Sequence, residues 1–216
     1  MDMPFLKTLL IWCLGAFAAG SIPFGLLLVK AAGKGDVRAH GSGNIGATNV
    51  MRAGGKGLGI ATLVLDAAKG FLPVFLAARV LDSQGLSFVV LAAVAGHVFT
   101  PWLRFKGGKG VATALGAVLA FHAAMVLPAL GVFILALLIF RYVSLGSVLA
   151  AVTLWVTALG FLGAWACRPV HSRWQVLAWT LLVGLVIRKH GDNLNRLFRG
   201  QESRFWGKPR KAGPDA

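Results

Sequence analysis

Long apolar runs alternate with short polar segments along almost the whole chain. A helix needs about 20 apolar residues to cross a bilayer, and fewer when it is tilted or enclosed by other helices. The pattern predicts an all-α fold, a polytopic transmembrane helical bundle of about seven spans (about five to seven), with a break at Pro128 between the fourth and fifth. The expected spans are residues 5–29, 58–80, 86–102, 111–126, 130–140 continued by Tyr142, 145–163 and 174–187.

Two of these runs contain residues that a plain span does not require. Gly20, Ser21 and Pro23 interrupt the first run, and such a break frees backbone groups that protein or water must satisfy. The break either kinks the helix for packing or opens it beside a site, and the sequence leaves both open. In the second run, Asp66 and Lys69 share a helix face, and we expect a structural ion pair that braces a neighbouring loop.

The composition supports the membrane class and adds a strong positive charge. Apolar residues make up 57% of the chain and charged residues 13%, against about 45–50% and 25% in a globular average. The net charge of +15 has three candidate partners, namely nucleic acid, anionic lipid headgroups and a phosphorylated substrate. The positions of the basic residues along the chain decide between these three partners.

The expected spans place most basic residues on one side. Residues 30–56, 104–109, Arg141 and the segment from Arg188 share that side. The opposite side carries only Lys7, Arg79, Arg168 and Arg173. Because cytoplasmic loops carry an excess of Lys and Arg, we expect the N-terminus outside and the C-terminus in the cytoplasm of a multi-pass protein of the cell (inner) membrane. We expect residues 1–204 to form one transmembrane domain and residues 205–216 a polar cytoplasmic tail.

The two cysteines predict no metal site and no disulfide framework. Cys13 lies in an apolar run and is expected to be a small buried hydrophobe. A disulfide between Cys13 and Cys167 is left open.

The first basic segment, residues 36–52, mixes glycine densely with Asn, Ser, Thr and Arg. Glycine tolerates positive φ, so several backbone N–H groups can point to one place and bind an anion together with nearby arginines. Residues 41–46 match G-x-G-x-x-G, but a span precedes them instead of a strand, which excludes a Rossmann site. We favour a phosphate-binding loop over a flexible linker, with Ser42, Gly43, Asn44 and Arg52 as its ligands.

The second segment interleaves lysine and glycine directly before a helix. Helix N-termini carry partial positive charge and spare N–H donors, which suits phosphate. The P-loop pattern does not apply, because Lys109 is followed by glycine. The alternative is that these are ordinary cytoplasmic lysines. The expected phosphate ligands are Lys106, Gly107, Gly108, Lys109 and Gly110.

The third segment, residues 188–202, brings His190 and Asn193 onto one helical face. Histidine can accept a proton near neutral pH, and asparagine can orient a hydroxyl or carbonyl group. The alternative is a basic amphipathic helix on anionic headgroups. Glu202 is one of seven acidic residues and is expected to pair with one of the nearby cations.

The three segments together resemble a known family. GSGNIGATNVMR, GHVFTPWLRFKGGKGVAT and HGDNLNRLFRGQE, in this order between these spans, are similar to the bacterial acyl-phosphate glycerol-3-phosphate acyltransferases of the PlsY type. The resemblance implies acyl transfer from acyl phosphate to the sn-1 hydroxyl of glycerol 3-phosphate, giving lysophosphatidic acid. It implies a catalytic set of Ser42, Arg52, His190 and Asn193, with the second segment binding phosphate and Glu202 structural.

The chemistry is compatible with these residue types. An acyl phosphate is already activated, so neither a cofactor nor a metal is expected, and neither acyl-CoA nor acyl carrier protein is expected as the direct donor. Partners are the two substrates and membrane lipid, without nucleic acid. The alternatives are an organic-phosphate or anion transporter, and a scaffold that binds anionic lipid or nucleic acid.

Overall fold

The computed structural model describes residues 3–160 and 172–205 of the chain. All regular structure in these two ranges is helical. In chain order it consists of α1 (Met3–Ser21), α2 (Phe24–Ala31), η1 (Val37–Ala39), α3 (Ala47–Gly54), α4 (Lys56–Ala77), α5 (Ser83–Val98), η2 (Pro101–Leu103), α6 (Val111–Phe121), α7 (Ala123–Phe140), α8 (Val143–Ala158), α9 (Arg173–Lys189) and α10 (Gly191–Phe198). The expected end of the sixth span at Gly163, Cys167 and the tail from residue 206 lie outside the described residues.

The all-α transmembrane class is confirmed. Within the described ranges, four helical stretches are long and apolar enough to cross a membrane: Met3–Ala31, Lys56–Ala77, Ser83–Leu103 and Ala123–Phe140. α6 and α8 are shorter apolar helices, and α9 has 17 residues. Many large apolar side chains of α1, α4, α7 and α9 are exposed, as expected where lipid replaces water around a bundle.

The predicted break at Pro128 is wrong. Pro128 lies inside α7, whereas α6 ends and α7 begins at His122, whose backbone is extended at φ −163°. The missing N–H of Pro128 frees the carbonyl four residues earlier, and spanning helices tolerate such a gap, as α4 does at Pro73. The fifth span also ends earlier than expected: Arg141, at φ 64°, terminates α7, and Tyr142 is the N-cap of α8.

Glycines allow two helix pairs to pack at close range. A Cβ atom on Gly20 or Gly96 would overlap a backbone carbonyl of the facing helix in the α1–α5 pair. In the α4–α6 pair, the same holds for Gly70 and Gly116. Small residues of this kind let helix backbones approach in membranes, where no hydrophobic effect drives helices together.

The break in the first span has its own polar partners. The Lys69 ammonium donates to the Ile22 carbonyl at 2.7 Å and lies 2.7 Å from Asp66 Oδ1. The Thr100 hydroxyl donates to the Ser21 carbonyl at 2.6 Å. Buried side chains thus satisfy two carbonyls at the break, which favours a packing kink over an opened helix, and the kink directs α2 toward the glycine-rich loop.

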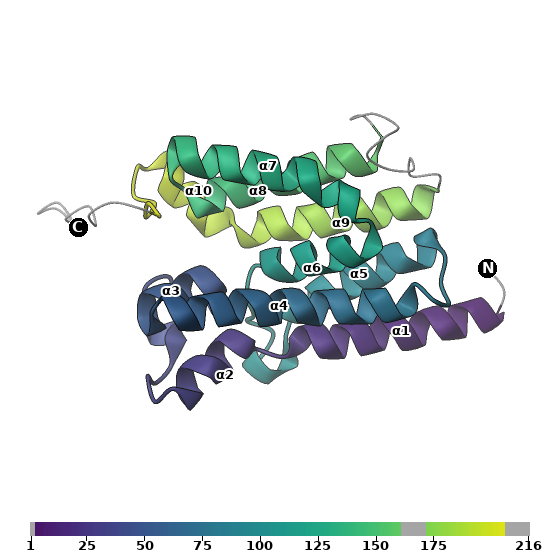
Figure 1. Ribbon diagram of the computed structural model, residues 1–216, viewed down its shortest axis with the longest axis horizontal. Helices are drawn as coiled ribbons and strands as arrows, with labels where there is room; N and C mark the ends of the chain where they lie inside the picture. The colour runs from purple at the N-terminus through teal and green to yellow at the C-terminus, as the bar shows by residue number, and fades with distance from the viewer. Residues whose placement is uncertain (1–2, 161–171, 206–216) are drawn as a thin grey trace, which may run out of the picture.

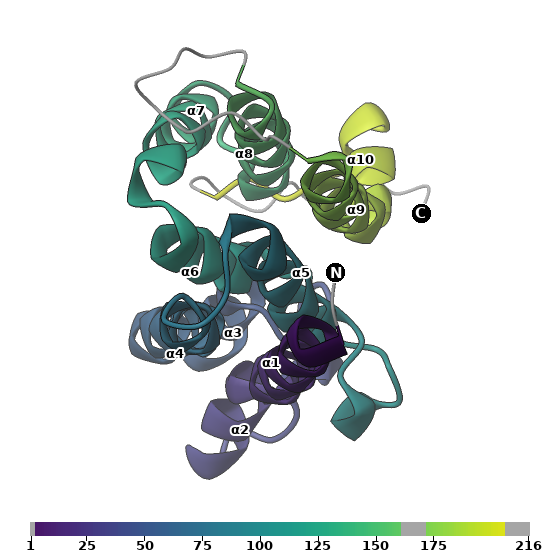
Figure 2. The ribbon, with the colours of Figure 1, turned by 90° about the vertical axis from the view of Figure 1, so that its right-hand side faces the viewer.

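The elements that carry the basic segments gather at one end of the bundle. α2, α3 and α10 lie at the end opposite the start of α1 (Figure 1). Seen from the side, α7, α8, α9 and α10 form one group and α1, α2, α4, α5 and α6 another (Figure 2). Segments far apart in the sequence therefore meet at this end.

Candidate functional site

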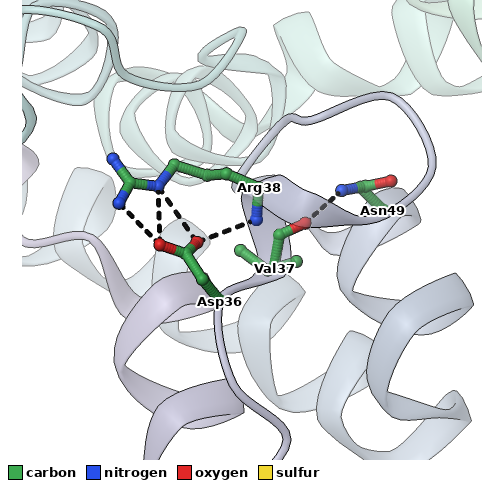
Figure 3. A network of polar contacts seen from close by, with 4 residues as sticks. All are labelled: Asp36, Val37, Arg38 and Asn49. Atoms are coloured by element: carbon green, nitrogen blue, oxygen red, sulfur yellow. Dashed lines mark hydrogen bonds and ion pairs between the residues drawn. The ribbon is translucent and has the colours of Figure 1, made fainter.

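A single buried amide organises the glycine-rich loop. Asn49, in the first turn of α3, is 2% exposed. Its Nδ2 donates to three carbonyl oxygens, those of Val37 at 3.1 Å, His40 at 3.0 Å and Asn44 at 2.8 Å. Its Oδ1 accepts from the Ser42 N–H at 2.9 Å. Figure 3 shows the side chain pointing at the Val37 carbonyl, beside the exposed Asp36–Arg38 ion pair.

Several loop amides are consequently occupied by the protein itself. Besides Ser42, the Gly43 N–H donates to the His40 carbonyl at 3.0 Å, and the Gly46 N–H donates to Asn44 Oδ1 at 2.9 Å. The loop thus has few free N–H groups to form an anion nest. What it presents to its surroundings are the side chains of Ser42 and Asn44.

The second segment folds back onto the end of α5. The Gly107 and Gly108 N–H groups donate to the Val98 and His97 carbonyls at 3.0 and 3.2 Å. A Cβ atom on either glycine would overlap His97. The geometry gives these two glycines a packing role, and their expected role in phosphate binding remains a prediction. Their tight turn delivers Lys109 to the neighbourhood of α10.

His190 occupies the corner between α9 and α10 and is 1% exposed. Its Nδ1 lies 2.8 Å from the Val186 carbonyl. A carbonyl can only accept, so Nδ1 carries the proton and Nε2 of the neutral ring is an acceptor. Burial and the nearby Lys109 charge lower the pKa of His190 to about 4, so the ring is neutral at physiological pH.

A polar chain links the second and third segments. The Lys109 ammonium donates to Asn193 Oδ1, and Asn193 Nδ2 donates to Glu202 Oε1 at 2.7 Å. Glu202 also accepts from the Ser144 hydroxyl at 2.8 Å and from Arg196 at 2.9 Å. The carboxylate thereby fixes the direction of the Asn193 amide and turns its oxygen toward Lys109.

Lys109 has an unusual environment for a lysine. Burial lowers its pKa to about 8, with the positive charges of Arg196 and Arg52 acting in the same direction and Glu202 opposing them. A partly desolvated ammonium beside other cations gains a great deal from an incoming anion. The residue is therefore suited to hold a phosphate.

The three segments surround one cavity of about 210 Å³. Four cationic side chains and one carboxylate, Asp192, line it, so the surroundings favour an anion. The lining residues are Ser42, Asn44, Lys109, Arg188, Lys189, Gly191, Asp192, Asn193 and Arg196.

The structure brings together part of the expected site. Ser42, Asn44, Lys109 and Asn193 line the cavity, and Arg52 is near enough for its charge to lower the pKa of Lys109. The other predicted residues do not line this cavity: Gly43, Lys106, Gly107, Gly108, Gly110 and His190.

Sequence reasoning missed three cationic lining residues and the central amide of the loop. Arg196 follows Asn193 by three positions, and this i, i+3 spacing on a helix could have identified it. Arg188 and Lys189 belong to the basic segment but were not singled out. Nothing in the sequence separates Asn49 from the other amides around it.

The fold and the site define an integral membrane helical protein with a cavity lined by cationic side chains at one end of its bundle, and comparison with known proteins specifies the class. Residues 10–200 match the family model described as glycerol-3-phosphate acyltransferase. The glycerol-3-phosphate acyltransferase of Trichlorobacter lovleyi is 49% identical over 91% of this chain and 97% of that protein. The corresponding protein of Geobacter sulfurreducens is 47% identical over 88% of this chain and 94% of its own length.

Solved structures agree with these relatives. A crystal structure of PlsY (YgiH), an integral membrane glycerol 3-phosphate acyltransferase, in its glycerol 3-phosphate form has a TM-score of 0.83 at 40% identity, covering 92% of this chain and 96% of that one. The lysophosphatidic acid form has a TM-score of 0.80. The chain belongs to the glycerol-3-phosphate acyltransferase family, and it is a membrane acyltransferase of the PlsY type.

Proposed function

We propose that this protein transfers a fatty acyl group from acyl phosphate to the sn-1 hydroxyl of glycerol 3-phosphate, giving lysophosphatidic acid and inorganic phosphate. The observation that carries the proposal is the cavity in which four cations surround Ser42, Asn44 and Asn193. Two phosphate-bearing substrates meet in this reaction, and a site with a strong positive excess suits both. The related PlsY was crystallised in glycerol 3-phosphate and lysophosphatidic acid forms, which supports the acceptor and the product.

The proposed step is a direct displacement at the acyl carbon. The hydroxyl oxygen bonds to the carbonyl carbon, the bond from that carbon to the phosphate oxygen breaks, and phosphate leaves with the electron pair. Because the donor is an activated anhydride, the protein chiefly binds and aligns, which can supply about 7–11 kcal/mol of the barrier. Lys109 and Arg52 neutralise phosphate charge, and Ser42 and Asn193 orient the groups that react.

His190 and a substrate phosphate both take part in removing the proton from the attacking hydroxyl group. The Nε2 atom of His190 accepts a hydrogen bond from the hydroxyl, in line with the neutral ring and the occupied Nδ1. A pKa of about 4 makes this ring a weak base at neutral pH, whereas a phosphate monoester titrates near pH 6. Nε2 therefore takes the proton as the hydroxyl oxygen bonds to the acyl carbon, and passes it to the departing phosphate, which is the stronger base, so the ring is neutral again.

The proposed setting is the cytoplasmic side of the cell membrane. The basic segments share the end of the bundle that carries α2, α3 and α10, and an excess of Lys and Arg is typical of cytoplasmic loops. At this position the cavity opens toward soluble glycerol 3-phosphate, while the acyl chain stays in the bilayer.

An assay with purified protein in detergent tests the proposal. Labelled glycerol 3-phosphate is incubated with acyl phosphate, acyl-CoA or acyl carrier protein, and the product is analysed for lysophosphatidic acid and its acyl position. We expect sn-1 product with acyl phosphate alone. Uptake of glycerol 3-phosphate into proteoliposomes without acylated product would favour the transporter alternative.

A further inference from the structure

The glycine-rich loop has no regular hydrogen-bonding pattern of its own over most of residues 40–46. Its shape depends on hydrogen bonds from outside the segment, and Asn49 provides three of them, with a fourth to Val37 just before the segment. Three carbonyls, spread over Val37, His40 and Asn44, converge on one Nδ2, and the Ser42 amide is held by Oδ1.

Asn49 does not line the cavity, whereas the residues that it holds do. Ser42 and Asn44 form the loop side of the cavity, and both contact Asn49 through their backbones. The Ser42 side chain is exposed, so packing restrains it less than it would a buried side chain. The amide is thus the link between the α3 scaffold and the cavity.

A neighbouring glycine shows how closely the loop fits this amide. Gly41 adopts φ +55°, and a Cβ atom added there would overlap Asn49 Oδ1 and lie 3.8 Å from Arg52 Cδ. Gly35, earlier in the same connection, adopts a comparable φ of +75° with nothing within 4 Å of an added Cβ. Both glycines have a positive φ that an L-residue adopts only with strain, but only Gly41 lies against the Asn49 side-chain amide.

We propose that Asn49 is a positioning residue that holds Ser42 and Asn44 in place for the substrate phosphate without touching the substrate itself. The proposal rests on the proposed function in that the bound anion is taken to be the phosphate of glycerol 3-phosphate. A buried amide that satisfies three carbonyls cannot be replaced by a carboxylate of the same shape, because the second oxygen would face three acceptors.

The test compares Asn49→Asp with Arg38→Ala, which removes the exposed ion pair on the same loop, and Gly41→Ala with Gly35→Ala. Binding is measured as the shift of the thermal midpoint by glycerol 3-phosphate and, separately, by inorganic phosphate. Turnover is measured as KM and kcat. Because a displacement of about 1 Å can cost on the order of 10²-fold, we expect Asn49→Asp to lower kcat/KM for glycerol 3-phosphate by that order, largely through KM.

We expect Gly41→Ala to weaken binding more than Gly35→Ala does, and Arg38→Ala to leave binding unchanged. If Asn49→Asp does not fold, the two glycine variants decide alone. Normal ligand shifts in Asn49→Asp, or equal losses in both glycine variants, would overturn the proposal, as would a wild-type protein that binds neither probe. A wild type that binds glycerol 3-phosphate but transfers no acyl group would contradict the proposed reaction, and the role of Asn49 would still be judged from binding.

Discussion

At the scale of single residues, hydrogen bonds between neighbouring groups fix the orientation or the tautomer of the side chains at the cavity. Glu202 directs the Asn193 amide, and Asn193 in turn receives the Lys109 ammonium. The Val186 carbonyl selects the tautomer of His190. These pairings give the basic residues around the cavity fixed positions, which the proposed binding of a specific anion requires.

The first residue-scale prediction concerns pH. Lys109, with its pKa lowered to about 8, loses its charge as pH rises through that value. A substrate phosphate is already dianionic near pH 8, so the protonation state of the substrate does not change in this range, whereas that of Lys109 does. We expect kcat/KM for glycerol 3-phosphate, which reports on the free enzyme, to fall above about pH 8. If kcat/KM stays constant up to pH 10, the positive charge of Lys109 does not contribute to binding glycerol 3-phosphate.

The second residue-scale prediction concerns His190. Replacement by alanine removes the acceptor that directs the substrate hydroxyl, so we expect His190→Ala to lower kcat about 10²–10⁴-fold with a smaller change in KM. His122→Ala is the matched control, because His122 lies exposed between α6 and α7. Steady-state kinetics with acyl phosphate measures both, and near-normal turnover of His190→Ala would contradict the proposed role.

At the scale of elements, the helix break between α1 and α2 connects the membrane core to the site. Lys69 and Thr100 satisfy the carbonyls of the break, and α2 then packs against the loop, since a Cβ on Gly25 would overlap the Ile45 carbonyl. The kink in the first span is therefore part of the support of the loop.

The element-scale prediction is that this support depends on a balanced ion pair. Lys69→Met leaves the Asp66 carboxylate, 3% exposed, without its lysine partner, and we expect a loss of about 3–5 kcal/mol of stability. The double variant Asp66→Asn with Lys69→Met removes both charges and should recover much of that loss. Thermal unfolding in detergent compares the three proteins, and equal midpoints for the two variants would contradict the expected coupling.

At the scale of the whole molecule, hydrophobic periodicity was sufficient for the fold class and most of the spans. It misplaced the boundary at Pro128, because a proline inside a membrane helix need not end that helix, as Pro73 inside α4 also shows. The segments that meet were predicted, since one-sided charge identifies a shared face. The sequence did not predict which backbone amides of the loop stay free or how Asn49 holds the loop, because both depend on tertiary hydrogen bonds.

The central claim is that the cationic cavity binds the substrates for acyl transfer, and Lys109 tests it most directly. The measurement is kcat/KM for glycerol 3-phosphate, with acyl phosphate as donor, for the wild type, Lys109→Met and the exposed control Lys56→Met. Loss of a charged hydrogen bond worth about 1.5–3 kcal/mol predicts at least about a ten-fold decrease for Lys109→Met and wild-type values for Lys56→Met. Unchanged formation of lysophosphatidic acid by Lys109→Met would contradict the account.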